Sequence, residues 1–188
     1  MAVDEGRLVR NVVKLVTPPE YKPKERDIWS KAEVRKFLRT AASTRLHAAW
    51  RLSLYGLRRG EVLGLRWSDI DLKDKTLTVN QARVLVDYKV RVEEPKSHNG
   101  KRTLPLDDDL VAALVELRKR QARESEVAGA AYGAVLANLD WYTEGDKYVI
   151  VDEFGTPHHP ESYSDEFTRV SSARGCPRSA CTTHGTQR

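Results

Sequence analysis

The residues best suited to chemistry are an arginine and a glutamate three positions apart. Arg58 lies in the stretch Leu54 to Asp71, where one predicted helix ends at Gly56 and another begins near Gly60. A guanidinium at such a turn can present its planar set of N–H donors to a phosphate, while the carboxylate of Glu61, one helical turn later, holds it in place. The same spacing is typical of an ordinary surface ion pair at a helix start. Spacing alone therefore leaves both interpretations open.

The full segment is more specific than the spacing. It reads LYGLRRGEVLGLRWSDID, and it closely resembles the first sequence box of the tyrosine recombinases, the phage integrase family. In that box Gly-x-Arg-x-x-Glu is followed by Leu-x-Leu-x-Trp-x-Asp-Ile-Asp. The resemblance places Arg58 on the family's first catalytic arginine and Glu61 on the acid that supports it. It extends over about residues 28–169.

A second box strengthens the resemblance. In the family a lysine lies in the last hairpin of a three-stranded sheet, and an arginine and the strand LPL follow it. Residues 94–106, EPKSHNGKRTLPL, meet this pattern and place Lys96 on the catalytic lysine. A lone lysine would instead be a solvated residue at a hairpin tip. We expect neighbouring basic and polar residues of the two boxes to bind DNA, namely Arg59, Ser97, Lys101 and Arg102.

The resemblance implies a transesterification on double-stranded DNA that uses no metal and no cofactor. In the family, arginines clamp the scissile phosphate and stabilise its developing charge, and the lysine is a general acid toward the leaving 5′ oxygen. A tyrosine near the C-terminus attacks phosphorus and forms a 3′-phosphotyrosine intermediate. Several tyrosines lie before that position, and none of them is expected to be the nucleophile: Tyr132, Tyr142, Tyr148 and Tyr163. His158 and His159 are interpreted as loop residues.

The last eighteen residues depart from the family. Family members continue with Gly-Leu-Pro and a box His-x-x-Arg, whereas residues 171–188 read SSARGCPRSACTTHGTQR. A back-translation of this region, shifted by one nucleotide, reads VKRAGLPKIRLHDTRHT, and His184-Gly185 permits only Arg or Trp in that frame. We therefore expect an out-of-frame peptide that follows a single-nucleotide loss near Val170. A naturally diverged polar tail is the alternative.

The two cysteines lie in this same tail. Cys176 and Cys181 form Cys-x4-Cys-x2-His with His184, but a structural zinc site needs four ligands and a convincing fourth is absent. We therefore predict no metal site. Two cysteines near one end also provide no disulfide framework for the body of the chain.

The predicted elements form an α+β domain, mostly helical, with a small three-stranded antiparallel sheet, incomplete at its C-terminus. Ser30-x-x-Glu33 is a capping box that predicts a helix from Lys31. Further helices are predicted over residues 45–55, 61–65 and 110–127 and from Pro160, and the last is expected to carry Tyr163 and Phe167 inward. Alternation with a period of two predicts strands in TLTV, ARVLV, KVRV and RTLPL, and Asn99-Gly100 predicts a hairpin between the last two.

Three parts of the chain are expected. The proline-rich residues 1–27 are interpreted as a remnant and linker from a missing core-binding domain. Residues 28–170 are interpreted as a partial integrase catalytic domain, and residues 171–188 as the out-of-frame tail.

Composition excludes other classes. The chain has 188 residues, enough for one domain, and its 32 Lys and Arg exceed its 27 Asp and Glu by five. This mildly basic balance is compatible with a polyanion partner. No apolar stretch approaches the roughly 20 residues of a membrane-spanning helix, and the N-terminus has no readable signal, so we expect a cytoplasmic protein with no membrane partner.

Two functional interpretations follow. The first is a site-specific DNA recombinase by descent, here an inactive fragment without the His-x-x-Arg box and the nucleophilic tyrosine. The alternative is a non-catalytic DNA-binding module or a partner of an intact recombinase protomer.

Overall fold

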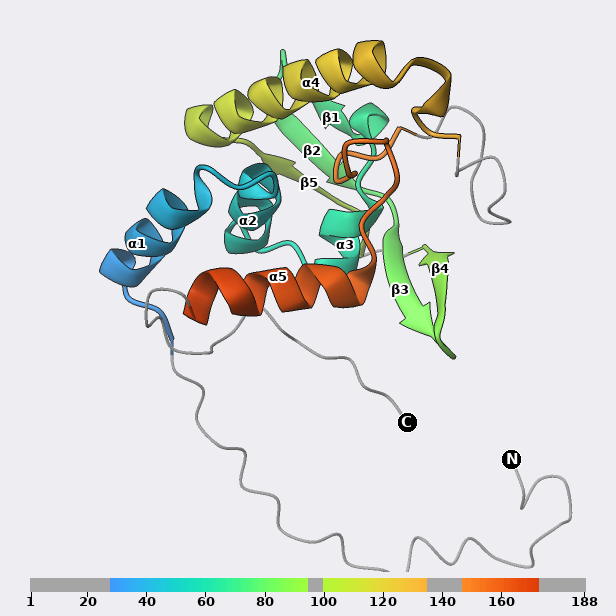
Figure 1. The fold of residues 1–188 in the computed structure, drawn as a ribbon. Coiled ribbons are helices and arrows are strands. Elements are labelled where there is room, and N and C mark those ends of the chain that lie inside the picture. The colour runs from blue at the N-terminus through green and yellow to red at the C-terminus, as the bar shows by residue number, and fades with distance from the viewer. Residues whose placement is uncertain (1–27, 95–99, 135–146, 173–188) are drawn as a thin grey trace, which may run out of the picture.

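The described helices enclose one core. The computed structural model describes residues 28–94, 100–134 and 147–172. In Figure 1, α4 lies along one side of the molecule and α5 along the other, with α2 and α3 between them. The bounds of the helices are α1 Lys31–Ala41, α2 His47–Leu54, α3 Arg59–Gly64, α4 Asp108–Ala128 and α5 Pro160–Ser172, with short 3-10 helices at Trp67–Asp69 and Gly129–Ala131. Mixed helices and small antiparallel sheets confirm the predicted α+β class.

The start of the domain follows its sequence signal. The hydroxyl of Ser30 accepts from the backbone N–H of Glu33, and the Glu33 carboxylate accepts from the backbone N–H of Ser30 at 2.7 Å. This capping box satisfies donors that the first turn of a helix leaves unpaired. The predicted start at Lys31 is therefore confirmed.

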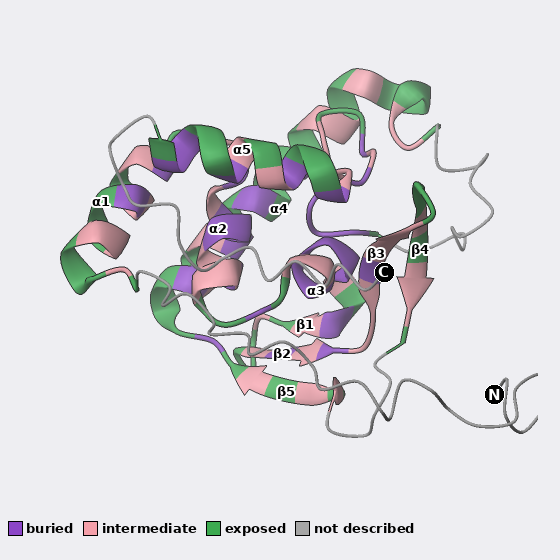
Figure 2. Cartoon of the chain, turned by 90° about the horizontal axis from the view of Figure 1, so that it is seen from below, coloured by how far each residue is buried: buried purple, intermediate pink, exposed green. Residues whose placement is uncertain are grey.

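Aromatic rings join α1, α2 and α5. Phe37 of α1 and Trp50 of α2 both contact Phe167 of α5, and the rings of Trp50 and Tyr163 lie 4.4 Å apart between centroids. Figure 2 shows that α2 and α3 are mostly buried, whereas α1 and α5 are buried on one side only. The inward position predicted for Tyr163 and Phe167 is confirmed, and burial of these large rings supplies much of the hydrophobic stabilisation.

The strands divide into two small sheets. The three-stranded sheet has the order β1 (Ile70–Asp71), β2 (Thr76–Val79), β5 (Arg102–Pro105), and all its pairs are antiparallel. Among the described residues, strands β3 (Ala82–Val86) and β4 (Lys89–Glu93) pair with each other and with no other strand. A three-stranded sheet was predicted, but the expected pairing of KVRV with RTLPL is wrong. RTLP pairs with TLTV instead.

Two side chains between β2 and β3 are bonded at the point where the sheets divide. The Asn80 amide donates to the Asp69 carboxylate at 2.8 Å, and the Gln81 amide donates to the Gly64 carbonyl at 2.9 Å. These bonds hold the residues after β2 against Asp69 and against α3, and β5 pairs with β2. Period-two alternation identifies strands, but it carries no information on which strands pair.

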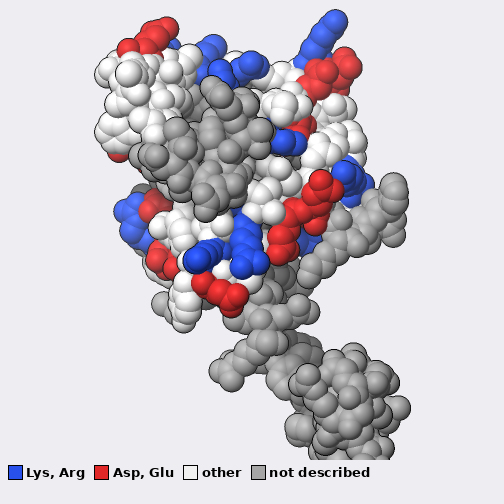
Figure 3. All heavy atoms as spheres, turned by 90° about the vertical axis from the view of Figure 1, so that its right-hand side faces the viewer, with Lys and Arg blue, Asp and Glu red and all other residues white. Residues whose placement is uncertain are grey.

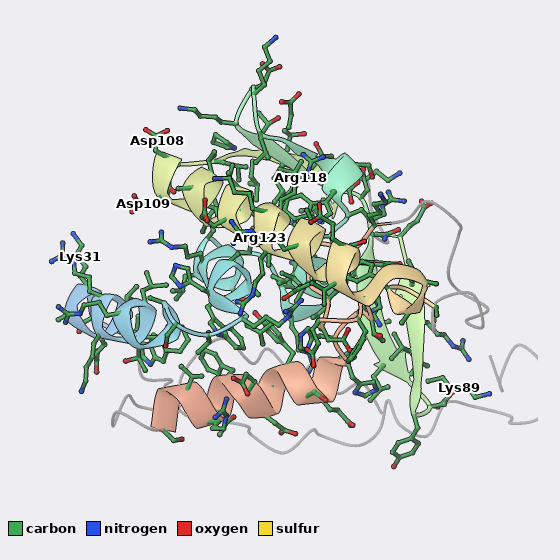
Figure 4. All side chains as sticks on the ribbon, turned by 45° about the horizontal axis from the view of Figure 1, so that its top comes forward. Lys31, Lys89, Asp108, Asp109, Arg118 and Arg123 are labelled. Atoms are coloured by element: carbon green, nitrogen blue, oxygen red, sulfur yellow. The ribbon has the colours of Figure 1, made fainter. Side chains whose placement is uncertain are left out.

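The tight hairpin turn of the described chain lies at Asp87-Tyr88. Val86 pairs with Lys89 across these two residues, whose φ angles are 50° and 60°. Two positive φ angles are typical of a type I′ turn. The sequence predicted a hairpin turn at Asn99-Gly100 and not at Asp87-Tyr88. Asn99 lies outside the described residues. Figure 4 shows Lys89 at the outer end of this hairpin, pointing away from the helices.

Candidate functional site

Arg58 occupies the residue immediately before α3. Gly56 ends α2 with a φ of +100°, a conformation that side-chain-bearing residues rarely adopt, and Leu57 is buried in the core. The next residue, Arg58, has an extended backbone and caps α3. Its side chain is 73% exposed, so its guanidinium faces solvent from a rigid turn.

Glu61 anchors this turn from inside. One carboxylate oxygen, Oε2, accepts the Arg58 backbone N–H at 2.7 Å, and the other, Oε1, accepts Nη1 of Arg58 at 2.9 Å. The Glu61 side chain is only 7% exposed. A buried carboxylate with this many donors is held in one orientation. The predicted support of Arg58 by Glu61 thus has a physical basis in these two contacts.

A second arginine binds the same carboxylate. Nη1 and Nη2 of Arg102, at the start of β5, donate to Oε1 and Oε2 of Glu61 at 2.9 and 2.8 Å. Burial alone would raise the pKa of Glu61, but the bonds from Arg102 and Arg58 outweigh it and hold that pKa below its ordinary value. Glu61 is therefore an anion that links α3 to the three-stranded sheet.

The other predicted DNA-binding residues have different surroundings. Arg59 is half-buried and donates to the Ser164 hydroxyl of α5 at 2.7 Å. Lys101 is 51% exposed and lies 3.7 Å from the carboxylate of Glu94. Glu94 and Lys101 thus approach each other at the two ends of residues 95–100. Lys96 and Ser97 lie within that segment, outside the described residues.

The tyrosines that were not expected to be the nucleophile, and the histidines that were interpreted as loop residues, lie at several places in the structure. Tyr148 and Tyr163 are buried, Tyr132 is half-buried, and Tyr142 lies outside the described residues. His158 and His159 belong to the loop before α5. Burial lowers the pKa of His158. Cys176, Cys181 and His184 also lie outside the described residues.

Arg83 is a residue whose burial the alternation pattern did not reveal. It is 2% exposed on β3, donates from Nη1 to the His158 carbonyl at 3.1 Å, and lies 5.4 Å from the centroid of the Tyr148 ring. Burial lowers its pKa to about 10. Its charge therefore lies in the interior, between β3 and the loop before α5.

The described surface carries both signs of charge. Figure 3 shows Lys and Arg interspersed with Asp and Glu on the face that includes the β3–β4 hairpin. None of the helices in the described part of the chain combines the length and apolar character that a bilayer crossing requires.

Known proteins are similar to this chain in sequence and in fold. The sequence model of the phage integrase family matches residues 29–187. The tyrosine recombinase XerC-like protein of Caldanaerobacter subterraneus subsp. tengcongensis is 32% identical over 192 residues, which span 94% of this chain and 47% of that protein.

Solved structures agree on the fold. The Tn1549 transposon integrase in complex with a circular intermediate DNA is 18% identical with a TM-score of 0.65, over 98% of this chain and 57% of that one. The lambda integrase dimer bound to a core site is 21% identical with a TM-score of 0.52, over 94% of this chain and 54% of that one. The chain thus spans about half the length of the relatives it matches. From the extent of the family match, the chain belongs to the phage integrase family.

Proposed function

We propose that this chain is part of the catalytic domain of a site-specific DNA recombinase, and that double-stranded DNA and other recombinase protomers are its partners. The observation that carries the proposal is the exposed guanidinium of Arg58, held at a rigid turn by the buried carboxylate of Glu61. Among the side-chain nitrogens of Arg58, the described residues show Nη1 alone bonded to Glu61, and because the side chain is largely exposed, its other N–H donors can bind a phosphate.

The proposed chemistry is the breaking and rejoining of a phosphodiester through a 3′-phosphotyrosine. Arg58 would neutralise charge on the phosphate oxygens as the transition state forms, which requires a donor fixed beforehand in the correct place. Lys96, as general acid, would donate a proton to the leaving 5′ oxygen. The tyrosine that attacks phosphorus is not assigned to any residue of this chain.

We further propose that the 188-residue polypeptide binds DNA but does not cut it. Residues 171–188 contain no His-x-x-Arg box, so the second arginine clamp is not supplied in this frame. A single-nucleotide loss near Val170 remains our proposal for this segment. The family match runs to residue 187, and this extent favours the alternative, a diverged tail that stays in frame.

Binding is tested with a labelled duplex and the purified chain. We expect weak binding with little sequence preference that falls steeply between about 50 and 200 mM salt, because phosphate contacts release counterions. Arg58→Ala should weaken binding and reduce the salt slope by about one. The control Lys119→Ala removes an exposed charge of α4 that pairs with Glu116, and it should bind as the parent does. Binding that is insensitive to salt would contradict the proposal.

Cleavage is tested with a nicked suicide duplex. The polypeptide as given should form no covalent adduct. A recombinase should form the adduct once the reading frame is restored. A non-catalytic DNA-binding module should form none even then. Site-specific nicking by the chain as given would overturn the inactive interpretation. Resequencing the gene around codon 170 separates a frameshift from a diverged tail.

A further inference from the structure

We propose that Arg102 is a positioning residue, which fixes Glu61 and through it Arg58, and is not itself a phosphate ligand. This inference rests on the proposed function, because it assigns Arg58 the contact with DNA. It also revises the expectation that Arg102 binds DNA directly.

The geometry of the guanidinium favours this role. Both terminal nitrogens of Arg102 point at one carboxylate, with Nη1 on Oε1 at 2.9 Å and Nη2 on Oε2 at 2.8 Å. Such a two-pronged pair fixes direction as well as distance. The Arg102 side chain is 27% exposed against 73% for Arg58. Arg58 is thus available to a ligand, whereas Arg102 is largely committed to Glu61.

The bonds form one continuous chain of contacts. Each Glu61 oxygen accepts from both arginines, because Oε2 takes the Arg58 backbone N–H and Oε1 takes Arg58 Nη1. Rotation of the carboxylate would break a bond to Arg58 whenever it broke one to Arg102. Arg102 therefore restricts the orientation of Glu61, and Glu61 restricts the turn that presents Arg58.

The strand that carries Arg102 is itself fixed. Arg102 is the first residue of β5 and pairs with Val79 of β2. Strand β2 is the central strand of the three-stranded sheet. Arg102 thus joins the three-stranded sheet, through its pairing with Val79, to the start of α3 at Arg58, through Glu61.

Electrostatics make the dependence measurable. The charged groups that face Glu61 within the described residues are Arg58 and Arg102. Burial raises the pKa of Glu61, and the two arginines lower it. Without Arg102 only Arg58 would oppose the effect of burial, so the pKa of Glu61 should rise. Lys101, the adjacent exposed residue, lies near Glu94 instead. Its replacement removes the same unit of charge without touching Glu61.

The first experiment needs no DNA. Carbon-13 NMR of the glutamate side chains across an acid titration reports the Glu61 pKa in the full chain, in Arg102→Met and in the control Lys101→Met. We expect the pKa to rise in Arg102→Met and to stay at the parent value in Lys101→Met. An unchanged Glu61 pKa in Arg102→Met would overturn the inference whether or not the chain binds DNA.

The second experiment is a double-mutant cycle on duplex affinity. Arg102→Met should weaken binding about 10-fold in the parent chain but less than about 2-fold in the Arg58→Ala background, because residues in one network are not additive. Equal losses in both backgrounds, with a salt slope reduced by about one, would identify Arg102 as a direct phosphate ligand. A parent chain that binds no duplex contradicts the proposed function and leaves the NMR experiment to decide this inference.

A conservative variant guards against unfolding. Arg102→Lys keeps one positive charge but cannot make the two parallel bonds. We expect Arg102→Lys to lose most of the affinity lost in Arg102→Met while its thermal unfolding stays cooperative. A folded Arg102→Lys protein that binds DNA as well as the parent would overturn the positioning role, because a lysine can replace an arginine as a simple phosphate contact.

Discussion

The Cα of Gly64 lies so close to β3 that a Cβ added to it would be 3.0 Å from the Cα of Ala82. One helical turn earlier, a Cβ on Gly60 would be 3.0 Å from the carbonyl oxygen of Arg83. Two glycines four positions apart thus let α3 rest directly on the backbone of β3. Because α3 begins beside Arg58 and contains Glu61, this contact sets the position of the whole site.

We predict that Gly64→Ala destabilises the chain by about 1–3 kcal/mol, the usual cost of an added methyl group that has no room. The neighbouring atoms are backbone and cannot rotate away. Gly64→Val should cost more than Gly64→Ala. Urea denaturation with circular dichroism measures both, and an unchanged midpoint in Gly64→Val would show that α3 does not rest on β3 this closely.

Stability should fall on acidification through Glu61. The pKa of Glu61 is held below its ordinary value of about 4.5 by Arg102 and Arg58 despite burial. The unfolded chain then binds this proton more readily than the folded one, so the contribution is present above about pH 4.5 and is lost as the pH falls through the lower folded value.

We therefore expect Glu61→Gln to be less stable than the parent at pH 7, by about 1–3 kcal/mol, and to show a weaker loss of stability between about pH 5 and 3. Denaturant titrations at several pH values give the comparison. Parallel stability curves for the two proteins would mean that Glu61 has the same pKa in the folded and unfolded chains.

Tyr163 should act as a structural residue only. Its hydroxyl lies 2.8 Å from the Ser53 hydroxyl and donates to the Ala49 carbonyl at 3.2 Å, and its ring is buried against Trp50. Tyr163→Phe should cost about 1 kcal/mol of stability, the typical net value of a buried hydrogen bond. It should leave DNA binding unchanged. A phosphotyrosine adduct on the repaired chain that disappears in Tyr163→Phe would refute this assignment.

Repair of the reading frame provides the strongest test of the site. We predict that the chain restored after Val170, with the downstream codons and an N-terminal DNA-binding domain, forms a covalent adduct and exchanges strands. Arg58→Ala in that protein should slow adduct formation by about 100- to 1,000-fold, because it removes a preorganised charge stabiliser. Single-turnover adduct formation on a suicide site measures the effect.

Two results would count against this prediction. The repaired protein could form no adduct on any candidate attachment site, or Arg58→Ala could react at the parent rate. The second result would show that Arg58 is not the first catalytic arginine.

Local signals in the sequence determined much of this domain. The capping box at Ser30 and Glu33 predicted where α1 begins, and the helix predicted from Pro160 was expected to carry Tyr163 and Phe167 inward, as α5 does. These features depend on residues within one or two helical turns of each other. The start of a helix and its buried face can therefore be predicted from residues that are close together in the sequence. The box around Arg58 likewise identified the family that the sequence comparison then showed.

Strand pairing and the grouping of the arginines required the tertiary structure. Nothing near Arg102 in the sequence indicates that it lies on Glu61, forty-one residues earlier, or that β5 pairs with β2 instead of β4. Arg83 alternates with apolar residues like a surface residue, yet it is buried against Tyr148 and the His158 carbonyl. Such contacts depend on how α3 and the sheets pack, and this packing is set by glycines and buried side chains acting over long sequence distances. Local periodicity reports which side of an element faces inward, but it does not report what that side meets.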